Sequence, residues 1–152
     1  MGDGMAESDD EAMGQENRDD NCQVVNPKGW PQPRGYSNGI LCPTGGRMLL
    51  LAGQVGWDAN EQIVEGGFVA QFRQSLLNIR TIVEAAGGEV GNVVRILGLL
   101  GDKDVYLENL KEIGLVWREV FGNHYPAMSF VEVSDFVEEG AQLELQADAW
   151  LP

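Results

Sequence analysis

The sequence has little cysteine, histidine or positive charge. Its 152 residues include two cysteines, one histidine, and ten basic against 24 acidic residues, for a net charge of −14. The two cysteines, Cys22 and Cys42, are too few for a disulfide framework and suit a reducing compartment. One histidine and two dispersed cysteines do not supply a transition-metal site, so we expect no metal. The negative charge, without a basic stripe, argues against nucleic acid and anionic membranes as partners.

Long apolar runs are missing too. The longest runs from Met48 to Ala52, whereas a bilayer-spanning helix needs roughly 20 residues. The N-terminus lacks the basic start and apolar core of a signal peptide, so we expect a cytoplasmic protein.

Acidic residues are concentrated at the N-terminus. Eight of the 24 acids and one of the ten bases lie within residues 1–20. Residues 1–21 offer little apolar surface to bury, while ordering each residue costs about 1–2 kcal/mol. The composition therefore predicts a disordered acidic tail over residues 1–21 and one domain over residues 22–152.

The spacing of apolar residues predicts two helices. In the first, steps of three and four residues join Phe68, Phe72, Leu76, Ile79, Val83 and Ala86. Gly87 and Gly88 end it. The second follows a turn at residues 101–104, where Asp102 or Asp104 could cap it. Its apolar face consists of Leu110, Ile113, Trp117, Val120 and Phe121.

Strands account for most of the remainder. Residues 36–41 and 47–53, separated by a turn at 43–46, suggest a hairpin, and a proline-rich arm over 26–34 precedes them with Trp30 as its anchor. Further strands are predicted at residues 93–100, 127–133 and 142–149. The order β-β-α-β-α-β-β predicts an α+β fold with two helices on one face of a mixed sheet. The other sheet face must then meet solvent or another subunit.

Several segments also carry a family resemblance. They are Leu-Ala-Gly-Gln-Val-Gly-Trp-Asp at 51–58, residues 71–79, Glu-Ala-Ala-Gly-Gly at 84–88, residues 125–133 and residues 143–147. In this order and spacing they resemble the Rid (YjgF-like, RidA-type) family of reactive-intermediate imine and enamine deaminases. The resemblance implies a chorismate-mutase-like (YjgF-like) subunit and a homotrimer, with the sheets forming a central barrel and the active sites in clefts between subunits. It implies hydrolysis of small imines or enamines, such as 2-aminoacrylate, to carbonyl compounds and ammonia without a metal or organic cofactor.

The same resemblance implies the site residues. Glu144 matches a glutamate near the attacking water and is the catalytic candidate. Gly114, Met128 and Phe130 stand where the family has Asn, a carboxylate-binding Arg and Cys. The substrate-binding candidates are Tyr36, Ala52, Gly53, Gly114, Met128, Ser129 and Phe130.

Met128 makes this sequence a divergent member and keeps alternatives open. An arginine clamps a carboxylate through two parallel hydrogen bonds, and methionine cannot, so we expect poor turnover of 2-aminoacrylate. One alternative is a non-catalytic trimer that binds a small molecule or a protein. Another is a deaminase of a ring-cleavage enamine such as an aminomuconate. Glu144 itself could be an ordinary solvated strand acid, or could pair with Glu132 across neighbouring strands.

Overall fold

The computed structural model describes residues 21–152, so the predicted acidic tail lies outside the described residues except for Asn21. The main sheet has the strand order β3 (Arg47–Leu50), β7 (Leu143–Leu151), β5 (Val93–Leu100), β6 (Ala127–Glu132). β4 (Gln54–Val55) also pairs with β7. β7 is antiparallel to its neighbours, whereas β5 and β6 are parallel, so the sheet is mixed.

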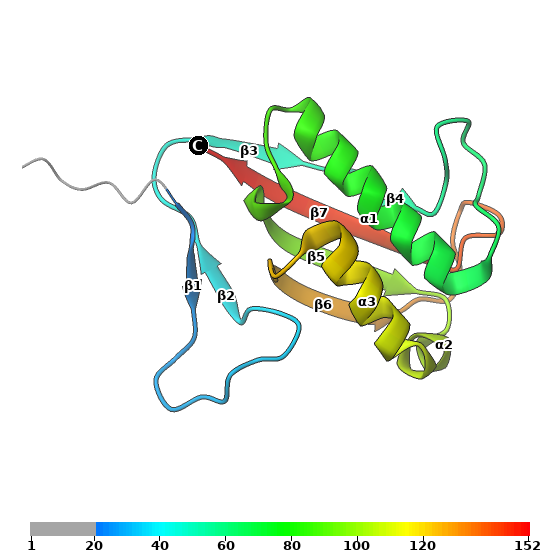
Figure 1. Ribbon diagram of the computed structural model, residues 1–152, viewed down its shortest axis with the longest axis horizontal. Coiled ribbons are helices and arrows are strands. Elements are labelled where there is room, and N and C mark those ends of the chain that lie inside the picture. Colours follow the sequence, from blue (N-terminus) through cyan, green and yellow to red (C-terminus); the bar gives the residue numbers. More distant parts are fainter. Residues whose placement is uncertain (1–20) are drawn as a thin grey trace, which may run out of the picture.

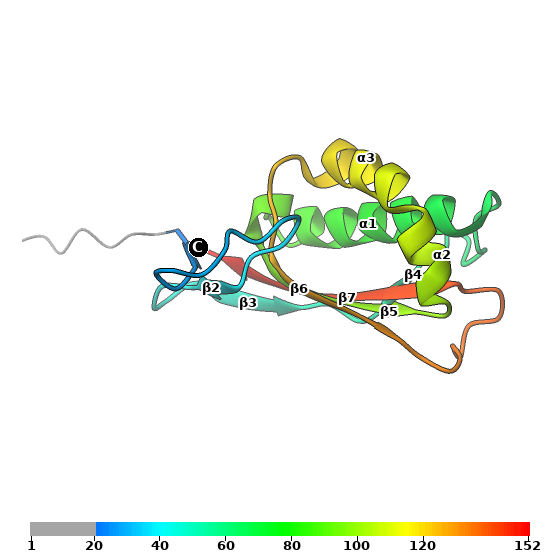
Figure 2. The same ribbon diagram turned by 90° about the horizontal axis from the view of Figure 1, so that it is seen from below.

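Three helices lie on one face of this sheet, as Figures 1 and 2 show: α1 (Gly67–Ala85), α2 (Lys103–Glu108) and α3 (Leu110–Phe121). A short 3-10 turn, η1 (Val90–Asn92), leads into β5. No helix covers the opposite face within residues 21–152. The predicted α+β layer is therefore confirmed, with three helices instead of two. None of the helices in this part of the chain is long and apolar enough to cross a membrane.

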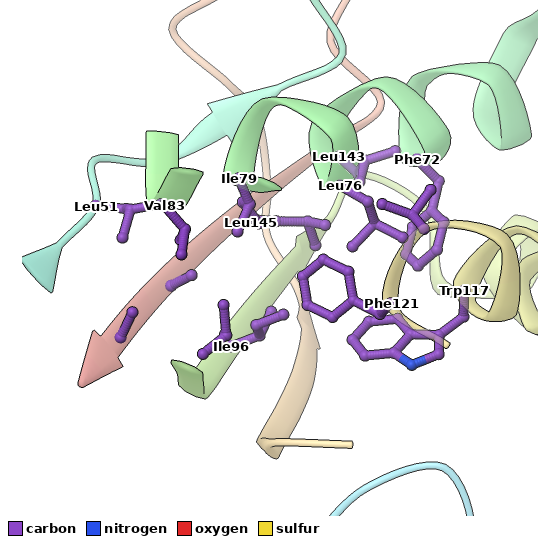
Figure 3. Close-up of a cluster of buried hydrophobic side chains, with 14 of the residues drawn as sticks. Leu51, Phe72, Leu76, Ile79, Val83, Ile96, Trp117, Phe121, Leu143 and Leu145 are labelled. Carbon is purple, nitrogen blue, oxygen red and sulfur yellow. The ribbon is translucent and has the colours of Figure 1, made fainter. Parts of the chain in front are cut away.

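The core lies between the helices and the sheet (Figure 3). The predicted stripe of α1 is confirmed, because Phe68, Phe72, Leu76, Ile79 and Val83 are all buried. They pack in one cluster with apolar side chains of β5, β7 and α3. Gly87, at φ +88°, ends the helix: its N–H donates to the Glu84 carbonyl at 2.9 Å, as predicted for this glycine pair.

The predicted second helix is two helices. Asp102 caps α2, because its carboxylate accepts hydrogen bonds from the N–H groups of Asp104 at 2.9 Å and Val105 at 3.3 Å. The helix is then interrupted at Asn109. The Asn109 side chain donates to the Val105 carbonyl at 2.7 Å and so competes with the helical backbone. Leu110 begins α3 as an exposed residue, and the rest of the predicted apolar face is buried.

The N-terminal prediction is wrong in two respects. β2 (Gly39–Leu41) pairs with β1 (Gln23–Val25) and not with β3, which pairs with β7. The turn at 43–46 therefore joins two sheets and does not close a hairpin. Trp30 does not anchor the preceding arm, since its side chain is 60% exposed in the loop between β1 and β2.

Candidate functional site

The site is built around β6, the edge strand of the sheet. Because strand side chains alternate between faces, Met128 and Phe130 lie on the helix side, which we call the covered face. Their partners on β5 are Ile96, which is buried in the core, and Gly98. A side chain at Gly98 would collide with the Phe130 ring, since its Cβ would lie 2.2 Å from the ring. The glycine thus lets Phe130 lie flat across β5.

A cavity of about 500 Å³ opens on the covered face between β6, α2, α3 and the loop that precedes β2. It brings together four of the predicted substrate-binding residues: Tyr36, Gly114, Met128 and Phe130. Two stacked pairs wall it, Tyr106 with Phe130 at 5.0 Å between ring centroids and Trp117 with Tyr125 at 6.0 Å. Burial raises the pKa of the Tyr106 phenol above its usual value, so this wall stays neutral.

Ser37 fixes the loop that brings Tyr36 to the cavity. Its buried hydroxyl donates to the Tyr125 carbonyl at 2.6 Å, and its N–H donates to the Pro126 carbonyl at 3.0 Å. These bonds tie residues far apart in the sequence to the start of β6. The loop therefore has a defined place beside the cavity.

A second cavity of about 480 Å³ lies along the other side of β6. Here Ser129 faces the uncovered side of the sheet, which we call the open face, in register with Leu97 and Gln146. Arg95 and Asp148 form an ion pair of 2.5 Å in its wall. Tyr36 and Met128 line both cavities.

Glu144 lies on the open face, away from both cavities. The structure brings Gly53 against it so closely that a Cβ on Gly53 would lie 1.7 Å from Glu144 Oε1. Glu144 and Gly53, together with the adjacent Ala52, form a separate cluster where β4 meets β7. The predicted substrate-binding residues thus fall into three groups within one chain, since Ser129 lines only the second cavity.

The hypothesis of a Glu132–Glu144 carboxylate pair is wrong. Glu132 is opposite Leu100 in β5, whereas Glu144 is opposite Leu99. Adjacent residues of β5 face opposite sides of the sheet, so the two carboxylates do as well. The Glu132 carboxylate instead accepts a hydrogen bond from the Lys103 N–H at 3.1 Å.

Two residues outside the predicted substrate-binding set, Arg34 and Arg118, also line the covered-face cavity. For Arg118 there was a signal, because it follows Gly114 by four residues and therefore lies one helical turn away on the same side. For Arg34 the signal was only its nearness to Tyr36 in the sequence. Within residues 21–152, no three His, Cys, Asp or Glu side chains are grouped as metal ligands.

Known proteins share both the sequence pattern and the fold. Residues 31–151 match the family described as endoribonuclease L-PSP. The chain is 32% identical over 115 residues to a 2-iminobutanoate/2-iminopropanoate deaminase of Capra hircus, covering 75% of this chain and 78% of the relative. It is 33% identical over 130 residues to a RutC family protein of Pyrococcus horikoshii, covering 84% and 97%.

A solved structure gives the same result. A Rid-family protein of unknown function from Yersinia pestis has a TM-score of 0.76 and 30% identity, covering 86% of this chain and 99% of that one. The chorismate-mutase-like (YjgF-like) α+β fold predicted for the subunit is therefore confirmed. From the match over residues 31–151 and these relatives, the chain belongs to the Rid (YjgF-like, endoribonuclease L-PSP) family, with Met128 at the position where the resemblance implies arginine.

Proposed function

We propose that the protein hydrolyses a small imine or enamine to a carbonyl compound and ammonia, without a cofactor. The observation that carries this proposal is that Tyr36, Gly114, Met128 and Phe130 line one cavity. The family membership and relatives named as imine deaminases support the reaction class.

Glu144 is the proposed catalytic base. Its carboxylate takes a proton from water as the water oxygen attacks the imine carbon. The proton then passes to the nitrogen of the tetrahedral intermediate. The same carboxylate then moves the hydroxyl proton of this intermediate to the nitrogen, so that the C–N bond breaks, the carbonyl forms and ammonia leaves. Gly53 supports this role because its missing side chain leaves room for the carboxylate beside the β4 backbone.

The position of Glu144 favours a site shared between subunits. In one chain, Met128 lines both cavities and Glu144 lines neither of them, so the two do not meet in one cavity. A homotrimer would let the open-face cluster of one subunit complete the cavity of its neighbour. Met48, Leu50 and Val131 are exposed apolar residues on that open face, as expected of a surface that a partner copy covers.

The test uses an imine generated in place by an amino-acid oxidase, with ammonia and keto-acid release as the readout. Glu144→Gln should lower kcat by roughly 10²- to 10⁴-fold, the usual contribution of a general base. Glu132→Gln is the matched control and should change little, because Glu132 faces the other side of the sheet. Equal losses in the two variants would refute the role of Glu144.

Mixed oligomers test the shared site. Glu144→Gln subunits keep an intact cavity, and Gly114→Leu subunits keep an intact Glu144 but fill the cavity. If each site uses both, refolding the two together in equal amounts restores about a quarter of the sites. No recovery, or a monomer in light scattering, would count against an intersubunit cleft.

A non-catalytic binding trimer is the second candidate, and Met128 is the observation that favours it. Methionine provides a soft apolar surface and no charge-assisted bond to a carboxylate. This candidate would be supported if the protein bound the ligand but released ammonia from the imine no faster than the reaction without protein. RNA is a poor fit to the charge of the described region, where residues 21–152 hold 16 acidic and nine basic residues.

A further inference from the structure

The covered-face cavity carries two positive charges and no negative one. Its walls include six aromatic residues, namely Tyr36, Phe72, Tyr106, Trp117, Tyr125 and Phe130. The charged residues that line it are Arg34 and Arg118, and none of its lining residues is acidic. This is notable in a region where acidic residues outnumber basic ones by 16 to nine.

Neither arginine has an acidic partner within residues 21–152. The ion pairs of this region use other arginines, Arg73, Arg80 and Arg95. Glu119, the acid next to Arg118 in the sequence, is held by Arg73 of α1. The positions three and four residues from Arg118 are glycine, leucine or phenylalanine, so the helix itself supplies no counter-ion. Both guanidinium groups are therefore available to an anionic ligand.

Gly114 leaves space for such a ligand. A helical side chain leans over the preceding turn, so Arg118 is directed toward the turn that contains Gly114. A Cβ at Gly114 would meet no atom within 4 Å. The absence of a side chain here keeps the cavity open next to the arginine.

We propose that this cavity binds a carboxylate with a planar apolar body, and that Arg34 and Arg118 hold the carboxylate while the aromatic walls hold the body. A volume of about 500 Å³ lies within the range of small-molecule sites. The arginines replace, from other elements, the carboxylate contact that Met128 does not make. If the proposed function holds, the substrates are imine or enamine acids with an aromatic or similarly bulky side chain.

Binding can be measured without catalysis. The probe is 3-phenylpropanoate, compared by calorimetry with its neutral analogue 3-phenylpropanamide and with propanoate, which lacks the ring. We expect the phenyl acid to bind about tenfold more tightly than the amide, because hydrogen bonds to a charged group are stronger than those to a neutral one, although solvent exposure reduces the difference. Propanoate should bind more weakly than the phenyl acid.

Variants of the cavity residues test separately whether charge and whether cavity shape contribute to binding of the probes. Arg118→Gln and Arg34→Gln should each weaken the acid several-fold and leave the amide unchanged, whereas Lys111→Gln, a control on α3 outside the cavity, should change neither. Gly114→Leu should weaken both probes. Equal binding of acid and amide, or unchanged binding in both arginine variants, would overturn the inference.

Activity distinguishes the two proposals. If the phenyl acid binds as expected but neither its imine nor a three-carbon imine is hydrolysed, the binding inference holds and the proposed function fails. If a three-carbon imine is hydrolysed while acid and amide bind equally, the proposed function holds and the inference fails.

Discussion

The two faces of the main sheet carry different side chains for a physical reason. On the covered face, Ile96, Leu143 and Leu145 are buried under α1 and α3 and belong to the core. On the open face, Glu144 and Gln146 alternate with them, and Leu50 is 73% exposed. One face is therefore completed by the chain itself, and the other still has apolar surface uncovered by any helix of residues 21–152.

The candidate site divides along the same line. The cavity with Met128 and Phe130 depends on the covered face, because the helices supply its walls. The cluster of Gly53 and Glu144 depends on the open face, because only there do β4 and β7 bring them together. Core packing and the proposed substrate cavity therefore belong to the covered face, and the proposed proton transfer belongs to the open face.

The largest expected effect is a loss of stability from a substitution in the core under the covered face. Leu76→Ala should lower the free energy of unfolding by about 2–5 kcal/mol, because it removes a fully buried side chain and leaves a cavity. Leu50→Ala is the control of identical chemistry on the open face. For an isolated chain it should change stability by less than about 0.5 kcal/mol, as exposed substitutions do.

Urea denaturation at low and high protein concentration measures both variants. A large loss for Leu50→Ala that grows with protein concentration would show that a partner copy covers the open face. Equal, concentration-independent losses for the two variants would contradict the distinction between the faces.

The sequence predicted the covered face better than the N-terminal part, because the two depend on interactions of different range. The stripe of α1 is local, since its residues are three or four apart and mark one side of the helix. The pairing of β3 is not local: Arg47 pairs with Leu151 at the far end of the chain. Proximity in sequence favoured the hairpin with residues 36–41, whereas the actual partner of β3 is β7, where Leu49 packs against the core.

The same limit applies to the site. The resemblance supplied Tyr36, Gly114, Met128 and Phe130, and the structure brings them together because β6 and α3 enclose one cavity. It could not supply Arg34, since only the Ser37 bonds to Tyr125 and Pro126 bring that loop to β6. Nor could it show that Glu144 and Met128 face opposite ways, because this depends on strand register.

A smaller effect is expected on the open face, at the contact between Gly53 and Glu144. Gly53→Ala places a methyl group on the Glu144 carboxylate, so this flexible side chain must leave its rotamer, at a cost of about 0.5–1.5 kcal/mol in stability. The deaminase rate should fall as well if Glu144 is the base. Gly114→Ala is the control for stability alone, because its added Cβ meets open space and alanine favours the helix by about 0.5–1 kcal/mol.

A double-mutant cycle isolates this contact. In a Glu144→Ala background, Gly53→Ala should cost much less stability than in the wild type, because the colliding carboxylate is gone. Purely additive free energies would show that Gly53 acts through the backbone and not through Glu144.

The smallest effect is expected in the separate β1–β2 sheet, which also has both exposed and partly buried side chains. Val24 and Leu41 are exposed, whereas Cys22 and Cys42 are partly buried free thiols whose sulfur atoms lie 3.0 Å apart. Burial, and then the hydrogen bond and charge of Cys42, raise the pKa of Cys22 to about 12. Cys22 should therefore stay a neutral thiol at pH 8–9, and the thiolate is the reactive form.

Cys42→Ala leaves Cys22 as the sole thiol, since the chain has two cysteines. Burial, the largest cause of the raised pKa of Cys22, remains in this variant. Iodoacetamide at pH 8.5 should therefore react with Cys22 more slowly than with free cysteine, whose pKa is about 8.5. Urea should abolish the difference. Above pH 8.5 the unfolded chain releases a proton that the folded chain retains, so this residue's contribution to stability is present below that pH and falls as pH rises toward 12. Cys22→Ser should remove this part of the loss of stability at alkaline pH. If Cys22 in the folded protein is alkylated as fast as free cysteine, the β1–β2 sheet does not shield the thiol.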